Sequence, residues 1–221
     1  VAIGTPSDNT VATAKIQNLA VTTAKIAADA VDGTKIADDA VNVEHIASGS
    51  LLVTADGQNN TVVGTNAGDS FSGTDANDNI LIGKDAGTAI TTGDSNVAIG
   101  SDALETTTTG NSNTAIGDEA LKLNTTAAAN TAVGAWALRA NTTGANNTSV
   151  GVDALLSNTT GAQNVAIGNG ALDANTTANN NTAVGHNSLT ANTTGANNTS
   201  IGEQSLEVST TGSGNTAVGQ K

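Results

Sequence analysis

A short phrase of alternating apolar residues, closed by a glycine, recurs along residues 60–219. One copy reads NVAIG at 96–100 and the next reads NTAIG at 113–117. Each copy places a small residue between two larger and mostly β-branched ones, and this alternation predicts a β-strand. The large residues of such a strand face one side and the small residues the other. We expect the Val/Ile column, with Ile116 as one member, to point into the fold, and the small Ala/Ser face to pack against another chain.

The glycine that closes the phrase returns at a fixed interval. Successive copies lie 17 residues apart, after a first step of 19 residues between Gly64 and Gly83. A short fixed period is the signature of one structural unit stacked many times. A column of glycines predicts a corner of the chain that needs positive φ or a close approach between backbones. The repeated glycines are Gly83, Gly100, Gly117, Gly134, Gly151, Gly168, Gly185, Gly202 and Gly219.

An asparagine precedes each of these glycines by four residues. In stacked β-structures, the side-chain amides of one column hydrogen-bond to those above and below. We therefore predict an asparagine ladder along the fold. Its members include Asn96, Asn113, Asn130, Asn147, Asn164, Asn181 and Asn198.

A leucine follows most of the glycines by four residues, and a stretch rich in Asn, Thr and Gly comes next, such as NTTG at 141–144. Asn, Thr and Gly together are typical of turns. Each repeat thus predicts a strand, a glycine corner, a short second strand that ends in leucine, and a polar return. The predicted fold class is all-β, a β-solenoid or β-roll built from 17-residue coils.

The repeats divide the chain into four regions. Residues 1–10 read as the end of a preceding repeat, because their first four residues match the later phrases, and we expect a segment of a longer chain. Residues 11–50 hold four ten-residue repeats with Val and Ile columns, which predict an extended stalk completed by partner chains. Residues 51–78 form a transition with a polar loop. Residues 79–221 carry the 17-residue repeat.

The composition fits a narrow, repeated core. Val, Ile, Leu and Phe together make up 43 of the 221 residues, and the net charge is −13. A solenoid needs only a few aliphatic side chains in each layer. With only seven Lys and Arg residues, the chain lacks the positive charge that nucleic-acid binding requires. No stretch approaches the roughly 18 apolar residues of a membrane-spanning helix, so we expect no membrane insertion.

Two repeat types resemble known families. The phrases NVAIGSDAL at 96–104, NTAIGDEAL at 113–121 and NVAIGNGAL at 164–172 resemble the head repeats of trimeric autotransporter adhesins, although the period here is longer. That resemblance implies a parallel β-roll and a homotrimer. The ten-residue strip, for example AVTTAKIAADAV at 20–31, resembles repeats of bacteriophage tail fibres.

The combination of both repeats is more similar to a phage fibre than to an adhesin. We therefore expect a structural, non-enzymatic segment of a homotrimeric tail fibre in the virion. It would space or present receptor-binding tips, with adjacent virion or fibre proteins and a host surface glycan as further partners. The alternative is the head of a trimeric adhesin on a bacterial surface. A carbohydrate-active enzyme is a third reading, for which the sequence offers no supporting motif.

Few residues are candidates for binding or chemistry. Trp136 lies in a column that is otherwise polar, so it should face solvent, where an indole can contact a glycan; packing on a neighbouring coil or chain is the alternative. Asp75 and Asp78 in the polar loop are weak candidates for Ca²⁺ ligands, against a simply solvated loop. His45 and His186 should be surface residues. No nucleophile is paired with a base, so we predict no catalytic residue, and we expect no cofactor.

Overall fold

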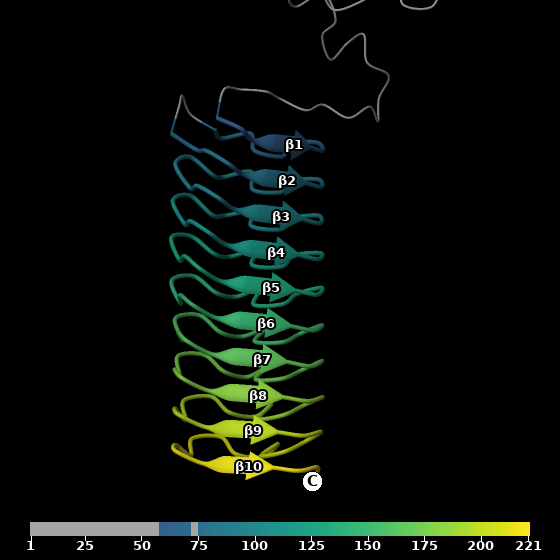
Figure 1. Cartoon of the computed structure of the whole chain (residues 1–221), viewed down its shortest axis with the longest axis vertical. Helices are drawn as coiled ribbons and strands as arrows, with labels where there is room; N and C mark the ends of the chain where they lie inside the picture. Colours follow the sequence, from purple (N-terminus) through teal and green to yellow (C-terminus); the bar gives the residue numbers. More distant parts are fainter. Residues whose placement is uncertain (1–57, 72–74) are drawn as a thin grey trace, which may run out of the picture. The chain divides into compact units, whose positions relative to one another are not determined.

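The computed structural model describes residues 58–71 and 75–221, and these form one β-solenoid. The predicted stalk at 11–50 lies outside the described residues. One short strand from each coil joins a single parallel sheet in sequence order (Figure 1). The strands are β1 (Thr61–Val63), β2 (Ile80–Ile82), β3 (Val97–Ile99), β4 (Thr114–Ile116), β5 (Thr131–Val133), β6 (Thr148–Val150), β7 (Val165–Ile167), β8 (Thr182–Val184), β9 (Thr199–Ile201) and β10 (Thr216–Val218).

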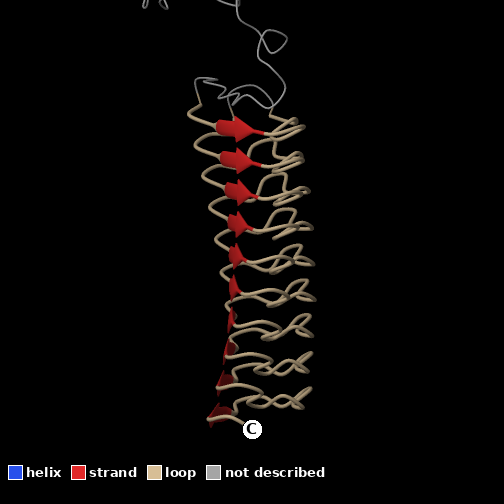
Figure 2. Ribbon diagram, turned by 90° about the vertical axis from the view of Figure 1, so that its right-hand side faces the viewer, coloured by secondary structure: helices blue, strands red, loops and turns tan. Residues whose placement is uncertain are grey.

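Neighbouring strands pair residue for residue, one period apart. Thr114 of β4 pairs with Thr131 of β5, and Ile116 pairs with Val133. Hydrogen bonds between coils continue outside the strands, since the Leu121 N–H donates to the carbonyl of Ala137 at 3.1 Å. The strands thus line one side of the stack and the turns lie on the other (Figure 2). The predicted β-solenoid of 17-residue coils is confirmed.

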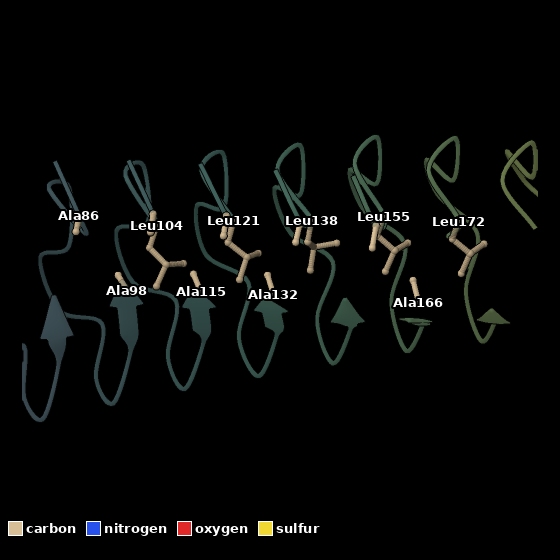
Figure 3. Close-up of a cluster of buried hydrophobic side chains, with 14 of the residues drawn as sticks. Ala86, Ala98, Leu104, Ala115, Leu121, Ala132, Leu138, Leu155, Ala166 and Leu172 are labelled. Carbon is tan, nitrogen blue, oxygen red and sulfur yellow. The ribbon is translucent and has the colours of Figure 1, made fainter. Parts of the chain in front are cut away.

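The core of each coil is narrow and is built from alanine and leucine. Ala115, at the centre of β4, points inward, and Leu121 reaches toward the strand from the opposite segment (Figure 3). Ala115, Ala120 and Leu121 have no exposed surface. The layers join into one continuous apolar column along the stack.

The two faces of the strands point in the opposite directions from those predicted. The small central residues point inward, whereas the Val/Ile column points outward and leaves 37% of Ile116 exposed. The reason is space, because leucine from the opposite segment fills the interior and close packing leaves room only for a small side chain. The prediction that Ile116 points inward is therefore wrong. The small Ala/Ser face is likewise unavailable for packing against another chain.

The segment that carries the leucine consists of turns and not of the predicted second strand. Residues 118–123 form consecutive turns. Glu119 and Leu121 have φ values of 54° and 52°, and the equivalent residues of the other coils repeat this left-handed conformation. A non-glycine residue in that region costs roughly 1–2 kcal/mol. Burial of the leucine and the hydrogen bonds between coils offset this cost.

The glycine corner is confirmed on both counts. Gly134 has a φ of +132°, and a Cβ atom built on it would lie 2.6 Å from the carbonyl oxygen of Gly151. The equivalent glycines of the other coils also have φ values between +128° and +141°. The column therefore needs glycine both for its backbone angle and for the contact between coils.

The asparagine ladder is also confirmed. The Asn147 Nδ2 group donates to Oδ1 of Asn130 at 3.2 Å and to the carbonyl of Gly161 at 2.9 Å. Its own Oδ1 accepts from the backbone N–H of Asn164 at 3.0 Å. Each amide thus uses its donor and its acceptor within the buried interior.

The structure contains a second asparagine ladder that the sequence analysis does not predict. The sequence pattern places Asn141 only in a turn, but the side chain is buried. Its Oδ1 accepts a hydrogen bond from Asn158 Nδ2 at 2.9 Å. Asn158 Nδ2 also donates to the carbonyl of Gly161 at 2.9 Å. The two ladders therefore meet at the same carbonyl. The signal for the second ladder is the asparagine column seven residues after the glycines.

The predicted transition at 51–78 includes the first coil of the solenoid. Thr61 of β1 pairs with Ile80 of β2, despite the longer step of 19 residues. The Gly68 N–H donates to the carbonyl of Ala86 at 3.0 Å, so the polar loop begins as part of the stack. Residues 72–74 of that loop lie outside the described residues.

Candidate functional site

Two columns of side chains lie side by side on the turns that follow the glycines. We call this surface the turn edge, and it comprises the residues two and five positions after each repeat glycine from Gly83 to Gly202. The first column is Asp85, Asp102, Glu119, Trp136, Asp153, Gly170, Asn187 and Gln204, and the second is Thr88, Glu105, Lys122, Arg139, Leu156, Asp173, Thr190 and Glu207.

Ion pairs connect the two columns between successive coils. Lys122 Nζ lies 2.8 Å from Oδ2 of Asp102, and Arg139 pairs with Glu119 in the same way one coil further. In both pairs the cation lies 20 residues after the carboxylate. The hydrogen bond from Lys122 lowers the pKa of Asp102, and the hydrogen bond from Arg139 lowers the pKa of Glu119. Lys122 and Arg139 thus compensate part of the negative charge of these coils, and Lys122 also lies 3.2 Å from a Glu105 oxygen and 3.3 Å from a Glu119 oxygen.

A hollow of about 470 Å³ opens on the turn edge beside Trp136. Trp136 is 44% exposed, so the prediction that its indole faces solvent is confirmed, while its contact with a glycan stays a prediction. All the lining residues belong to the turn edge and none to the strands. They are Glu119, Trp136, Arg139, Asp153, Leu156 and Asp173.

The charge pattern of the turn edge changes inside this hollow. Asp173 lies 20 residues after Asp153, the spacing at which Asp102/Lys122 and Glu119/Arg139 combine a carboxylate with a cation. Asp85 and Glu105 are also two carboxylates at this spacing, but each pairs with a lysine. Partial burial, and then the charge of Asp153, raises the pKa of Asp173. Within the described part of the chain neither aspartate has an ion pair. The hollow therefore presents two uncompensated carboxylates next to an aromatic face.

Asp173→Asn should slightly stabilise the solenoid at pH 7. A carboxyl whose pKa is raised by folding is destabilising once ionised, so its removal should add about 0.3–1 kcal/mol to the free energy of unfolding at this partly exposed site. The gain should shrink as the pH falls through the raised pKa toward the unfolded value near 3.9, because both states are then protonated. Urea unfolding at pH 7 and at about pH 3.5 measures it. A loss of stability at pH 7 would mean that Asp173 has a stabilising partner.

The other predicted candidates lie apart from the hollow. Asp75 and Asp78 are exposed, and Oδ1 of Asp78 accepts from Asn59 Nδ2 at 3.1 Å. In the described ranges, no three His, Cys, Asp or Glu side chains are grouped so that they could hold a metal ion. His186 is exposed as expected, whereas His45 falls outside these ranges. Residues 58–71 and 75–221 also contain no helix that is long and apolar enough to cross a membrane.

A second hollow lies on the last coil and has a simple structural origin. Leu206 and Ala217 line it, and both occupy columns that are covered by a following coil in the preceding layers. This hollow is therefore the uncovered end of the apolar core. The hollow beside Trp136 is therefore the stronger candidate for a binding site.

The sequence indicated the exposure of Trp136 but not its neighbours. Asp153, Leu156 and Asp173 are 17 to 37 residues away from it in the chain. The available signal is the tryptophan in an otherwise polar column, together with two aspartates 20 residues apart in the two columns. No protein-family model, curated protein sequence or solved structure matches the chain.

Proposed function

We propose that this chain is a structural segment of a homotrimeric fibre, and that the fibre spaces or presents receptor-binding tips of a phage tail. One observation carries the proposal, namely the outward face of the ten strands, which we call the strand face. It consists of the first and third residues of each strand. No charged residue occurs there in any of the ten strands.

The strand face leaves large apolar side chains in water. Among the described residues, ten large hydrophobic side chains are exposed, and six of them belong to the strand face: Ile80, Ile82, Ile116, Ile167, Ile201 and Val218. Contiguous apolar surface of this kind is typical of a protein–protein interface. Because the columns repeat at the spacing of β-strands, about 4.8 Å, another copy of the chain matches them layer by layer.

Charge makes the strand face the least repulsive place for a second and third copy of the chain. The chain carries a net charge of −13, so copies repel one another wherever acidic side chains meet. The turn edge holds many of these acidic side chains, whereas the strand face has none. Association through the strand face buries the exposed isoleucines and keeps the charged columns apart and in water.

The resemblance to phage fibres and the stacked architecture support a spacing role. A solenoid lengthens by adding identical layers, each held to the next by backbone and asparagine hydrogen bonds. The hollow beside Trp136 favours a second candidate, the head of a bacterial adhesin that contacts its host directly. Immunogold electron microscopy with serum against residues 75–221 separates the two, because label on phage tails supports the fibre and label on bacterial cells the adhesin.

Ile116→Asp should abolish assembly and leave the single solenoid folded. Ile116 points outward, so the new charge is tolerated in one chain, but in a trimer it brings three like charges into an apolar interface. The native mass should fall from three chains to one, as measured by light scattering or native mass spectrometry. Circular dichroism should still report β-structure.

Leu123→Asp is the matched control for this experiment. Leu123 is 38% exposed, close to the 37% of Ile116, but it lies on the turn side of the coil. This variant should remain trimeric. A wild-type mass of one chain, or a trimer that survives Ile116→Asp, would overturn the proposed assembly.

A further inference from the structure

The hollow beside Trp136 follows two coils in which ion pairs join the two columns of the turn edge. Lys122 compensates Asp102, and Arg139 compensates Glu119. At the next two steps of the same 20-residue spacing, Leu156 follows Trp136 and Asp173 follows Asp153. Asp85 and Glu105 are two carboxylates at the same spacing, but each has a nearby lysine, Lys84 and Lys122 respectively. Asp153 and Asp173, in contrast, have no ion pair within the described residues.

The aromatic ring supplies a second and independent feature. Trp136 exposes 44% of its surface and lines the hollow together with Leu156 and the two aspartates. The face of an indole attracts cations, and it also offers a flat apolar surface to the C–H face of a sugar ring. The hollow of about 470 Å³ falls within the size range of small-molecule sites.

We propose that this hollow binds a saccharide unit that carries a free amino group, with the sugar ring on Trp136 and its ammonium group between Asp153 and Asp173. Two carboxylates accept hydrogen bonds from an ammonium group, and such charge-assisted bonds are the strong ones. The ligand thereby provides the charge that Lys122 and Arg139 provide in the earlier coils.

The charge balance of the lining residues disfavours acidic sugars. Arg139 is already paired with Glu119, so it contributes no net attraction for an anion. Asp153 and Asp173 leave the hollow with a net negative charge. A uronic acid or a sialic acid brings a like charge to this surface, and repulsion of this kind is costly near a partly buried group.

This inference deepens the proposed function, since host attachment is its biological setting, but it does not depend on assembly. Every lining residue lies on the turn edge, and none lies on the strand face. Binding can therefore be measured on the trimer or on the single chain. A failure of trimerisation would leave the binding result intact, and the reverse also holds.

Tryptophan fluorescence gives a direct readout, because Trp136 is the only tryptophan and the chain has no tyrosine. The probes are a trisaccharide of glucosamine, the same trisaccharide fully N-acetylated, and maltotriose. Titrations at about pH 5.5 keep most of the glucosamine amines protonated, and ordinary carboxyls remain ionised. We expect the glucosamine trisaccharide to shift the emission saturably, and to bind about tenfold more tightly than the two neutral sugars.

Three substitutions assign the effect to the hollow. Asp153→Asn and Asp173→Asn should each weaken binding of the glucosamine trisaccharide about tenfold, the size of one charged hydrogen bond. Asp118→Asn removes an equal charge from an exposed residue that does not line the hollow, and its affinity should stay within about twofold of wild type. Calorimetry extends the comparison to Trp136→Ala, in which binding should be lost.

Several outcomes would overturn the proposal. Equal binding of maltotriose would show that the carboxylates do not select a cation. An equal loss in Asp118→Asn would show attraction by overall charge and no defined site. An unchanged emission with all three sugars, together with no heat of binding, would remove the site altogether.

Discussion

Gly134→Val should break the stack at the corner after β5. The φ of +132° at Gly134 is closed to valine, and its Cβ atom would lie 2.6 Å from the carbonyl oxygen of Gly151. Backbone strain of about 1–3 kcal/mol and a steric overlap of similar size together cost about 4 kcal/mol. The melting temperature should fall by about 10 °C or more. Hydrogen exchange should accelerate most in β5 and β6, because each coil contacts only its neighbours.

Gly219→Val separates the two causes. Gly219 has nearly the same φ, +134°, but a Cβ atom there meets nothing within 4 Å. In a protein that ends at Lys221, this variant should lose at most the contribution of backbone strain, about 1–3 kcal/mol. If both variants melt at the same temperature, the close approach between coils contributes nothing. If Gly134→Val melts like the wild type, the corner geometry itself is wrong.

The glycine and asparagine columns could be predicted because each position requires a property that few residue types possess. Gly134 repeats because no other residue satisfies its angle and its contact. Asn147 repeats because its short planar amide offers two donors and an acceptor, which serve the neighbouring asparagines and a backbone carbonyl at once. A fixed period indicates which residues lie above one another, so both columns follow from the sequence without knowledge of the cross-section.

The orientation of the strands could not be predicted in this way. The alternation in β4 gives two faces, one with Ala115 and one with Thr114 and Ile116, and both are uncharged. Periodicity shows that the faces differ but does not show which of them is buried. The decision depends on Leu121, which comes from the opposite side of the coil and fills the interior. Which face of the strand is buried therefore depends on the width of the coil, and this width cannot be derived from the repeat period.

The turns after the glycines could not be predicted from the sequence, for a related reason. Leucine rarely adopts positive φ, and nothing in the local sequence around Leu121 signals it. The conformation is imposed by stacking, because the Leu121 N–H donates to Ala137 in the next coil. The candidate site depends on these turns, since they set the 20-residue offset between its two columns. The exposure of Trp136 could therefore be predicted, but the hollow that it lines together with Asp153 and Asp173 could not.

Asn147→Asp should destabilise the solenoid strongly at pH 7 and less in acid. The substitution replaces only the Nδ2 group, which donates to Asn130 Oδ1 and to the carbonyl of Gly161. The new carboxylate would face two acceptor oxygens in a buried layer, and an uncompensated buried charge costs about 3–5 kcal/mol. Its folded pKa would lie above the unfolded value near 3.9. The penalty is thus complete above the folded pKa and shrinks as the pH falls through it, because the protonated carboxyl donates again.

Asn146→Asp provides the control through the same chemical change one residue away. Asn146 is exposed, and its φ of 60° suits aspartate as well as asparagine. Its urea midpoint should therefore stay close to the wild-type value at pH 7 and at about pH 4. The buried variant should unfold at much lower urea at pH 7 and recover part of the difference at about pH 4. Equal stability of the two variants at pH 7 would contradict the ladder, because Nδ2 of Asn147 would then have no buried acceptor to satisfy.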